Sequence, residues 1–179
     1  MAGQAQDIAG ALERVQSVLR RRPETGLHDD APATAIWSSG TRVVARHANG
    51  TEMATDMPGE LGGSGDRVSP GWLLRAGFAS CTTTCIAMQA AAQGIELESL
   101  EVRATSRSDT RGLLGMAGAD GRPVGAGPSD MQMHVRISAR GVSAERLRAL
   151  VEETYRRSPM ACAVENAVPV SLSIEIGDD

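Results

Sequence analysis

The sequence predicts an α+β fold in which antiparallel strands form two groups, separated along the chain by one long, buried helix. The helix is indicated by residues 71–93, a stretch with only one charged side chain, Arg75. Strands are indicated by alternation of apolar and polar residues, most clearly at 168–176. Aromatic residues form only 2% of the chain, so aliphatic side chains and eight methionines must fill a thin core, which favours dimerisation.

The first 32 residues are predicted to precede the main domain. Residues 7–22 carry apolar side chains along one helical face, at Ile8, Leu12, Val15 and Leu19. Pro23 ends this amphipathic helix, and the polar stretch 23–32 is typical of a linker. We therefore expect a helix and linker over 1–32 and a single domain over 33–179.

The domain is predicted to begin with an antiparallel meander. Two β-prone pieces, 35–37 and 42–47, are separated by Ser38-Ser39-Gly40, and Asn49-Gly50 predicts a second hairpin turn. The glycine-rich stretch 58–70 that follows lacks the spacing of a phosphate-binding loop. We expect it to be a connector and to bind no nucleotide.

Residues 71–93 are predicted to form a helix that is buried nearly all round. Ser69 provides an N-cap, Pro70 suits the first turn and Gly94 ends the run. A membrane span is disfavoured, because three threonines, two glutamines and Arg75 make the stretch too polar for a hydrocarbon core.

Alternating strands dominate the second half of the chain. Half-buried strands are predicted at 100–104 and 131–137, with a turn-rich loop at 115–130 between them. The strictest alternation lies at 168–176, and it predicts a final strand.

Two further helical segments are predicted between these last strands. Ser143 caps the first, which must break near Ser158-Pro159 because proline disfavours helix in the residue before it. A short helical turn over 160–166 follows.

The charge distribution excludes some classes of partner. The net charge is −4 without long runs of one sign, so there is no basic stripe to neutralise a nucleic-acid backbone. Arg20, Arg21 and Arg22 suit the negative dipole end of the first helix. The first residues lack the features of a secretion signal, so we expect a cytoplasmic protein without nucleic-acid or membrane partners.

Three cysteines, Cys81, Cys85 and Cys162, are the candidates for chemistry. Their odd number argues against a structural disulfide framework and leaves thiol chemistry open. Cys81 and Cys85 lie four residues apart on one face of the long helix, where cysteine usually serves as a small apolar side chain. A reactive thiolate there needs a nearby cation, because burial raises the pKa of a thiol.

Arg42 is the first candidate for that cation. Arg46 lies in the same predicted hairpin region, and Arg67 in the glycine-rich loop is third. The histidines have no metal-ligand spacing, so we expect no metal and no other cofactor; they are His28, His47 and His134.

One block of the sequence resembles a known family. Residues 58–81 combine a glycine-rich loop, a helix started by proline and the run Ala76-Gly77-Phe78-Ala79-Ser80-Cys81. This block resembles the OsmC and organic hydroperoxide resistance (Ohr) proteins, and the order of elements is similar over about 33–176. The resemblance implies an OsmC-like fold, in which antiparallel sheets wrap the central helices of an intertwined homodimer and each site lies at the subunit interface.

The resemblance also implies thiol chemistry on peroxides. Cys81 would attack an organic hydroperoxide as a thiolate, release the alcohol and become a sulfenic acid that a second thiol resolves. Arg42 is then expected to hold the thiolate ionised, and an external dithiol to reduce the product. Trp72 and Phe78 are expected to line an apolar pocket or to pack against the sheet.

Two positions depart from the family pattern. The resolving cysteine expected before a proline is Ser158 here, and the glutamate expected after Pro70 is Gly71. We favour Cys162 as the substitute resolver because a loop moves more easily than a helix turn; Cys85 and an external thiol are the alternatives. These departures leave a second interpretation, a non-catalytic OsmC-like protein that binds a small apolar molecule or senses oxidants.

Overall fold

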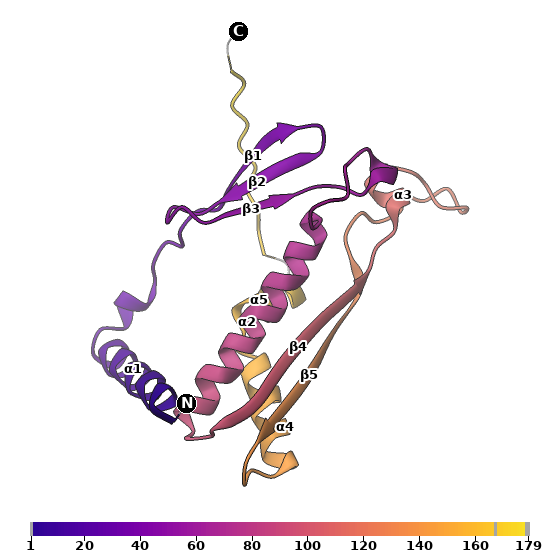
Figure 1. Cartoon of the computed structure of the whole chain (residues 1–179). Helices are drawn as coiled ribbons and strands as arrows, with labels where there is room; N and C mark the ends of the chain where they lie inside the picture. The colour runs from indigo at the N-terminus through magenta and orange to yellow at the C-terminus, as the bar shows by residue number, and fades with distance from the viewer. Residues whose placement is uncertain (1, 167, 178–179) are drawn as a thin grey trace.

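The structure is a computed structural model that describes residues 2–166 and 168–177. The central element is the helix α2 (Pro70–Ala92). The hairpin of β4 (Leu97–Arg107) and β5 (Ser129–Ala139) runs alongside it (Figure 1). Helix α4 (Ala144–Tyr155) packs on α2 as well, and a small sheet lies at the N-terminal end of α2. The prediction of an α+β fold with antiparallel strands before and after a long helix is confirmed.

Helix α2 begins and ends where its local sequence predicts. The Ser69 hydroxyl accepts a hydrogen bond from the Trp72 amide at 3.2 Å, and Pro70 occupies the first turn. Gly94, at φ +65°, turns the chain out of the helix in a left-handed conformation that glycine adopts at little cost.

The prediction that this helix is buried nearly all round is wrong for the single chain. Its buried residues form one stripe at about one helical turn's spacing: Phe78, Thr82, Ile86, Ala90 and Ala91. Other apolar side chains are substantially exposed, including Trp72, Leu74 and Met88. The hairpin, α1, α4 and α5 all contact α2, but together they do not enclose it, so part of its apolar surface stays exposed.

The β4–β5 hairpin shows the predicted alternation. Leu100 faces Ile137, Val102 faces Val135 and Ala104 faces Met133 in antiparallel register. These side chains are half-buried, and the residues between them are mostly exposed. The core gathers five buried side chains from α2, the start of the hairpin and α4, namely Ile86, Ala90, Ile95, Leu147 and Leu150.

The small sheet is the predicted meander. Its strands are β1 (Thr34–Ser39), β2 (Arg42–Arg46) and β3 (Glu52–Thr55), in the order β1-β2-β3 with antiparallel pairing. Gly40 and Gly50 make the two turns at φ +54° and +88°. A short 3-10 turn, η2 (Gly59–Leu61), follows within the glycine-rich connector.

The N-terminal helix α1 (Ala2–Arg21) starts earlier than predicted and packs against α2. A 3-10 turn, η1 (Pro23–Gly26), and an extended, exposed segment then lead to β1 (Figure 1). Arg20 and Arg21 lie in the last turn, as the helix-dipole argument expects. The division of the chain at residue 32 stays a prediction.

The C-terminal half contains α3 (Thr110–Leu113), α4 and α5 (Pro159–Glu165). The predicted strand at 168–176 is wrong within this chain, because the described residues 168–177 contain no strand. The apolar side chains of this segment are exposed, from 59% at Val168 to 89% at Val170. A period-two pattern selects one face for burial, but a strand also needs a neighbour, and the described residues supply none to this segment.

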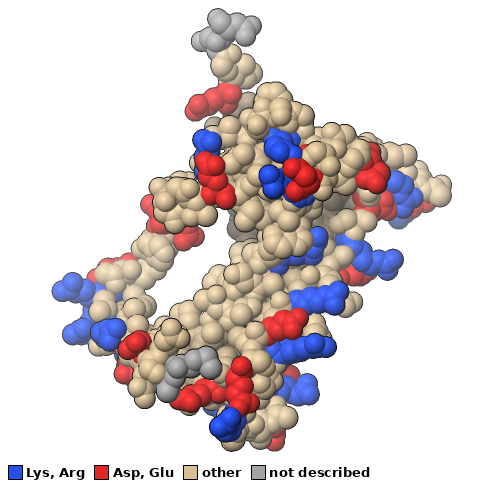
Figure 2. Space-filling model, viewed as in Figure 1, with Lys and Arg blue, Asp and Glu red and all other residues tan. Residues whose placement is uncertain are grey.

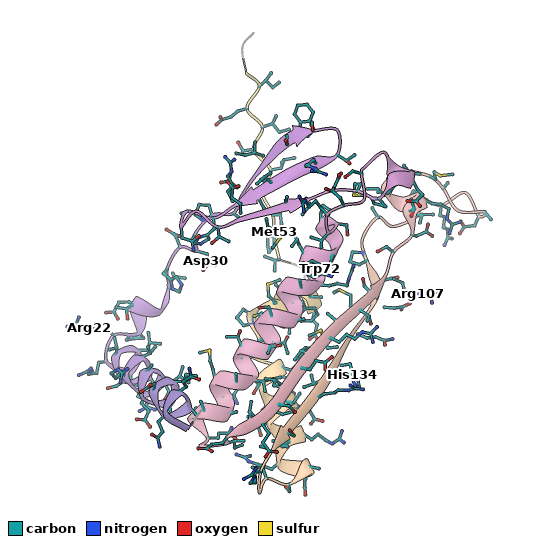
Figure 3. All side chains as sticks on the ribbon, viewed as in Figure 1. Arg22, Asp30, Met53, Trp72, Arg107 and His134 are labelled. Carbon is teal, nitrogen blue, oxygen red and sulfur yellow. The ribbon has the colours of Figure 1, made fainter. Side chains whose placement is uncertain are left out.

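Surface charges of both signs are interspersed over the face shown in Figure 2. Arg107 and His134 project from the β4–β5 hairpin on the side away from α2 (Figure 3). Among the described residues, no helix combines the length and the apolar character that a membrane crossing needs.

Truncation of the core is expected to destabilise the fold. Leu150 is fully buried, so Leu150→Ala should lower the free energy of unfolding by about 2–5 kcal/mol in a denaturant titration. Leu114→Ala is the matched control, because Leu114 is 60% exposed and its truncation leaves no cavity. Equal losses for the two variants would show that the core is placed wrongly.

Candidate thiol site

Cys81 and Ser158 meet at the centre of the molecule. Cys81 lies in the middle of α2, and its Sγ is 3.6 Å from Oγ of Ser158, with either atom able to donate the hydrogen. Ser158 is fully buried and lies just before Pro159, the first residue of α5. Within the described chain its hydroxyl makes no capping hydrogen bond, which leaves it directed at the thiol.

The local sequence places Ser158 there. Helix α4 ends at Tyr155, and the Ser158 amide bonds back to the Tyr155 carbonyl at 3.0 Å. Pro159 keeps Ser158 out of the helical conformation and starts a new helix in a different direction. The proline break predicted from the sequence is therefore what turns this side chain toward α2.

Cys85 is the third member of this cluster. It lies one helical turn after Cys81 and is half-buried. Burial raises the pKa of the Cys85 thiol, and the Cys81 sulfur raises it further, whereas a hydrogen bond with Ser158 lowers it. Two thiols and one hydroxyl thus lie within interaction range of one another.

An aromatic pair, the aromatic wall, lies near the thiols along the chain, because Phe78 is three residues before Cys81 and Tyr155 three residues before Ser158. Phe78 is buried one turn before Thr82, and its ring centroid lies 6.3 Å from that of Tyr155 at the end of α4. The Tyr155 hydroxyl donates to Oε1 of Glu165 at 2.7 Å. Burial, together with this carboxylate, raises the pKa of Tyr155 to about 12. Trp72, by contrast, is half-exposed near the start of α2 (Figure 3).

Cys162 is not brought to Cys81. It lies on α5 with an exposed side chain, and its thiol donates to the Arg156 carbonyl oxygen at 3.5 Å. Its amide bonds to the Ser158 carbonyl, so the two residues are one turn apart on the same helix. Its assignment as the resolving thiol stays a prediction that would require α5 to move.

Arg42 lies in a separate polar cluster at the base of the small sheet. Its Nη2 donates to Asp56 Oδ2 at 3.1 Å, to Ser64 Oγ at 2.8 Å and to Asp66. Among the described residues, no hydrogen bond joins Arg42 to Cys81. The cation and the thiol named from the sequence are thus not paired within one chain.

Asp56 is a buried carboxylate that accepts hydrogen bonds from Arg42 and its neighbours. Hydrogen bonds from Ser64 and Thr41 hold the pKa of Asp56 far below its usual range, and Arg42 adds to the effect. Its ionised form therefore stabilises the loop above about pH 4, and that contribution is lost as the pH falls toward the lower pKa. Sequence reasoning missed Asp56, because a lone aspartate after a strand carries no motif.

The glycine-rich loop folds tightly around this cluster. A side chain at Gly63 would place its Cβ 1.7 Å from the Met57 carbonyl oxygen, so only glycine fits. This close approach delivers Ser64 and Asp66 to Arg42. Asp66 thus provides a carboxylate partner for the arginine, although Gly71 stands where the family pattern has glutamate. Of the other candidates, Arg46 pairs with Glu52 at 2.8 Å, whereas Arg67 shares Asp66 with Arg42, at 3.7 Å.

The family model for OsmC-like protein matches residues 63–173, which is more than half of the chain and includes both cysteines of α2. The chain belongs to the OsmC-like protein family. No functionally curated relative matches it. The family resemblance seen in the sequence is confirmed.

Solved structures share the fold of this OsmC-like chain. An OsmC-like protein from Mycoplasma pneumoniae superposes with a TM-score of 0.64 at 17% identity, over 79% of this chain and 91% of that chain. An organic hydroperoxide resistance protein from Elizabethkingia anophelis, with thiocyanate bound, gives 0.60 at 22% identity over 79% and 91%. A putative organic hydroperoxide resistance protein from Vibrio cholerae, with captopril in one of its active sites, gives 0.53 at 22% identity over 79% and 89%.

Metal ligands are not gathered anywhere in the described part of this OsmC-like chain. Residues 2–166 and 168–177 contain no group of three or more His, Cys, Asp or Glu side chains placed to hold a metal ion. The site is therefore described by its thiols, the Ser158 hydroxyl and the aromatic wall.

The titration of Tyr155 tests the geometry around the site. It is the only tyrosine, so phenolate absorbance reports it alone and should give a midpoint of about 12 in the folded protein. Glu165→Gln should lower the midpoint, because it removes the negative charge beside the hydroxyl. Since folding raises this pKa, the pair stabilises the fold below about pH 10 and progressively less as the pH rises above it. A wild-type midpoint near that of free tyrosine, with circular dichroism still folded, would contradict the contact.

Proposed function

We propose that this protein is a thiol peroxidase that reduces organic hydroperoxides, with Cys81 as the nucleophile. The observation that carries the proposal is the half-buried Cys81 thiol, 3.6 Å from a buried hydroxyl and close to an apolar, aromatic wall. Family membership supports it, as do structural neighbours named organic hydroperoxide resistance proteins.

The first step follows from the thiol's surroundings. The Cys81 thiolate attacks the distal oxygen of the hydroperoxide, the O–O bond breaks, and the alkoxide leaves and takes a proton to become the alcohol. The sulfur is oxidised by two electrons to a sulfenic acid. In this step Ser158 donates its hydroxyl hydrogen to the thiolate, and the apolar wall favours an organic peroxide over hydrogen peroxide. A second thiol and an external dithiol then return Cys81 to the thiolate.

The proposed active unit is a homodimer. The β4–β5 hairpin is a two-stranded sheet, so each of its strands has one edge that no other described strand pairs with. An open groove of about 370 Å³ lies between β5 and α4 and is lined by Met133, Val135, Ile137 and other side chains. The exposed segment 168–176 has the alternation of a strand that pairs with a neighbour. A second copy would supply that neighbour and cover the open side of α2.

The proposed dimer also provides a role for Arg42, the candidate cation beside the thiolate. Within its own chain Arg42 is bound to Asp56 and Asp66, so we propose that it serves Cys81 of the other subunit across the interface. The Asp56 and Asp66 carboxylates would then hold the guanidinium in one orientation. A cytoplasmic location stays a prediction.

The second candidate function is redox sensing or small-molecule binding without turnover. Ser158 favours it, because a buried serine next to Cys81 cannot form the disulfide that completes a peroxidase cycle. The two functions differ in the fate of oxidised Cys81. A sensor keeps the oxidised state, whereas a peroxidase returns to the thiolate many times.

Hydroperoxide turnover is the direct test. Reduced protein with cumene hydroperoxide and a dithiol should consume many equivalents of peroxide, and a sulfenate-trapping dione should label Cys81. Cys81→Ser should abolish both signals, and Arg42→Met should lower the rate of the first turnover by about tenfold or more, because it removes a charge that stabilises the thiolate. Ser80→Ala is the control, since Ser80 is the exposed neighbour of Cys81. Labelling of Cys81 without multiple turnovers would favour the sensor, and no labelling together with no peroxide consumption would reject both the peroxidase and the redox sensor.

The oligomeric state tests the dimer separately. Wild-type protein should sediment as a dimer at micromolar concentration. Leu172→Asp with Ile174→Asp should shift it to the monomer, because charges replace apolar side chains on the face that the dimer would bury. Ser173→Asp is the matched control on the opposite face of the segment. A wild-type monomer, or an equal shift by Ser173→Asp, would contradict the proposal.

A further inference from the structure

We propose that Cys85 is the resolving thiol of this protein, so that Cys81 and Cys85 form a disulfide across one turn of α2 in each catalytic cycle. This inference rests on the proposed peroxidase function and deepens it. It assigns the step that Ser158 cannot perform.

The positions of the other two candidates support this assignment. Ser158 occupies the place next to Cys81, fully buried and 3.6 Å from its sulfur. Cys162 is one turn further along α5, with its exposed thiol bonded to the Arg156 carbonyl oxygen. To reach Cys81, Cys162 would have to break this contact, and Ser158 would have to leave the interior.

Cys85 needs a much smaller movement. Side chains four apart on a helix have Cβ atoms about 5–6 Å apart. A disulfide needs about 3.5–4.5 Å, so the two cysteines of α2 must approach by roughly 1–2 Å. A local loosening of the turn between Cys81 and Cys85 is enough for this approach.

The residues of that turn favour loosening. The three positions between the cysteines are all threonine, a β-branched residue that stabilises a helix less than alanine or leucine. The Thr83 hydroxyl donates to the Ala79 carbonyl at 2.8 Å, a side-chain contact that competes with regular helical bonding. Thr82 Oγ1 is buried without a hydrogen-bond partner among the described residues. Unwinding one turn frees backbone groups that this hydroxyl can bind.

The electrostatic interaction between the two thiols makes oxidation of Cys81 precede deprotonation of Cys85. Burial raises the pKa of the Cys85 thiol, and charge on the neighbouring Cys81 sulfur raises it further, so both favour the protonated form of Cys85. Oxidation turns Cys81 into a neutral sulfenic acid and removes that charge. Cys85 then loses its proton more easily, and its thiolate attacks the Cys81 sulfur. Hydroxide leaves, takes that proton and departs as water, and the S–S bond forms.

A pocket lined by Cys85 gives a reductant access to the disulfide. It has a volume of about 180 Å³ and lies between three helices. Its lining includes Leu12 and Gln16 from α1, Cys85 and Met88 from α2, and Arg157 just after α4. A dithiol in this pocket attacks the Cys85 sulfur and releases the Cys81 thiolate. Its second thiol then breaks the mixed disulfide and frees Cys85, leaving the reductant oxidised by two electrons.

The experiment maps the disulfide by mass spectrometry. Cleavage after Arg75 and Arg103 leaves Cys81 and Cys85 on one tryptic peptide, whereas Cys162 lies on the peptide that follows Arg157. After one equivalent of cumene hydroperoxide and alkylation, the inference expects the first peptide to lose two hydrogens and to resist alkylation. Cys162→Ser should retain this product. Cys85→Ser should lose it and accumulate a Cys81 sulfenate that the dione traps.

A second variant restores the family's arrangement. Cys85→Ser with Ser158→Cys should form a disulfide between the two tryptic peptides and regain multiple turnovers that Cys85→Ser has lost. A link between Cys81 and Cys162 in the wild type, or a Cys85→Ser variant that turns over like the wild type, would overturn the inference while the peroxidase function stands. Absence of any Cys81 sulfenate in Cys85→Ser, together with no peroxide consumption by the wild type, would instead reject the proposed function.

Discussion

The packing of one stripe of α2 against α4 and the β4–β5 hairpin is the interaction on which the rest of this structure depends. Ile86 and Ala90 of α2 meet Leu147 and Leu150 of α4, and these side chains are almost completely buried. This contact fixes the place where α4 ends, and Pro159 then turns the chain so that Ser158 faces Cys81. The site thus depends on the core, because Cys81 and Ser158 lie on elements whose relative positions the core packing fixes.

The same packing leaves much apolar surface uncovered. The hairpin and helices α1, α4 and α5 contact α2, yet only one stripe of α2 is fully buried, and the chain has few aromatic side chains to extend that cover. The exposed segment 168–176 and the groove beside α4 add to the open apolar surface. A single copy is therefore an incomplete structure in physical terms, and the proposed dimer accounts for both the open helix face and the unpaired alternating segment.

The chemistry of the site is concentrated in one helix. Where the family pattern has a second cysteine, this chain has a buried hydroxyl that can stabilise a thiolate but cannot form a disulfide. The thiol that could replace it is one turn away on α2, across three threonines. The groups that stabilise the Cys81 thiolate, Ser158 and the Arg42 cluster, would then come from outside α2. The thiol that reacts with the Cys81 sulfenic acid, Cys85, would come from α2 itself.

Local sequence predicted those parts of the fold whose cause is local. The limits of α2 follow from Ser69, Pro70 and Gly94, and the half-buried β4–β5 strands follow from their alternation, because caps and periodicity act over a few residues. The same reasoning was wrong on the burial of α2 and on the strand at 168–176. Periodicity says which side chains are suited to burial, but it cannot say whether the chain has anything to bury them against.

The features of the site, like those of the fold, divide into those that the sequence predicts and those that depend on tertiary packing. The sequence by itself determined that Cys81 lies mid-helix, that a proline break places Ser158 where a resolving cysteine was expected, and that the chain resembles its family. Only the tertiary structure decided that Ser158 touches Cys81 from 77 positions away, that Cys162 points elsewhere, and that Asp56 and Asp66 hold Arg42. These contacts depend on how separate elements pack, and no pattern within one element carries that information.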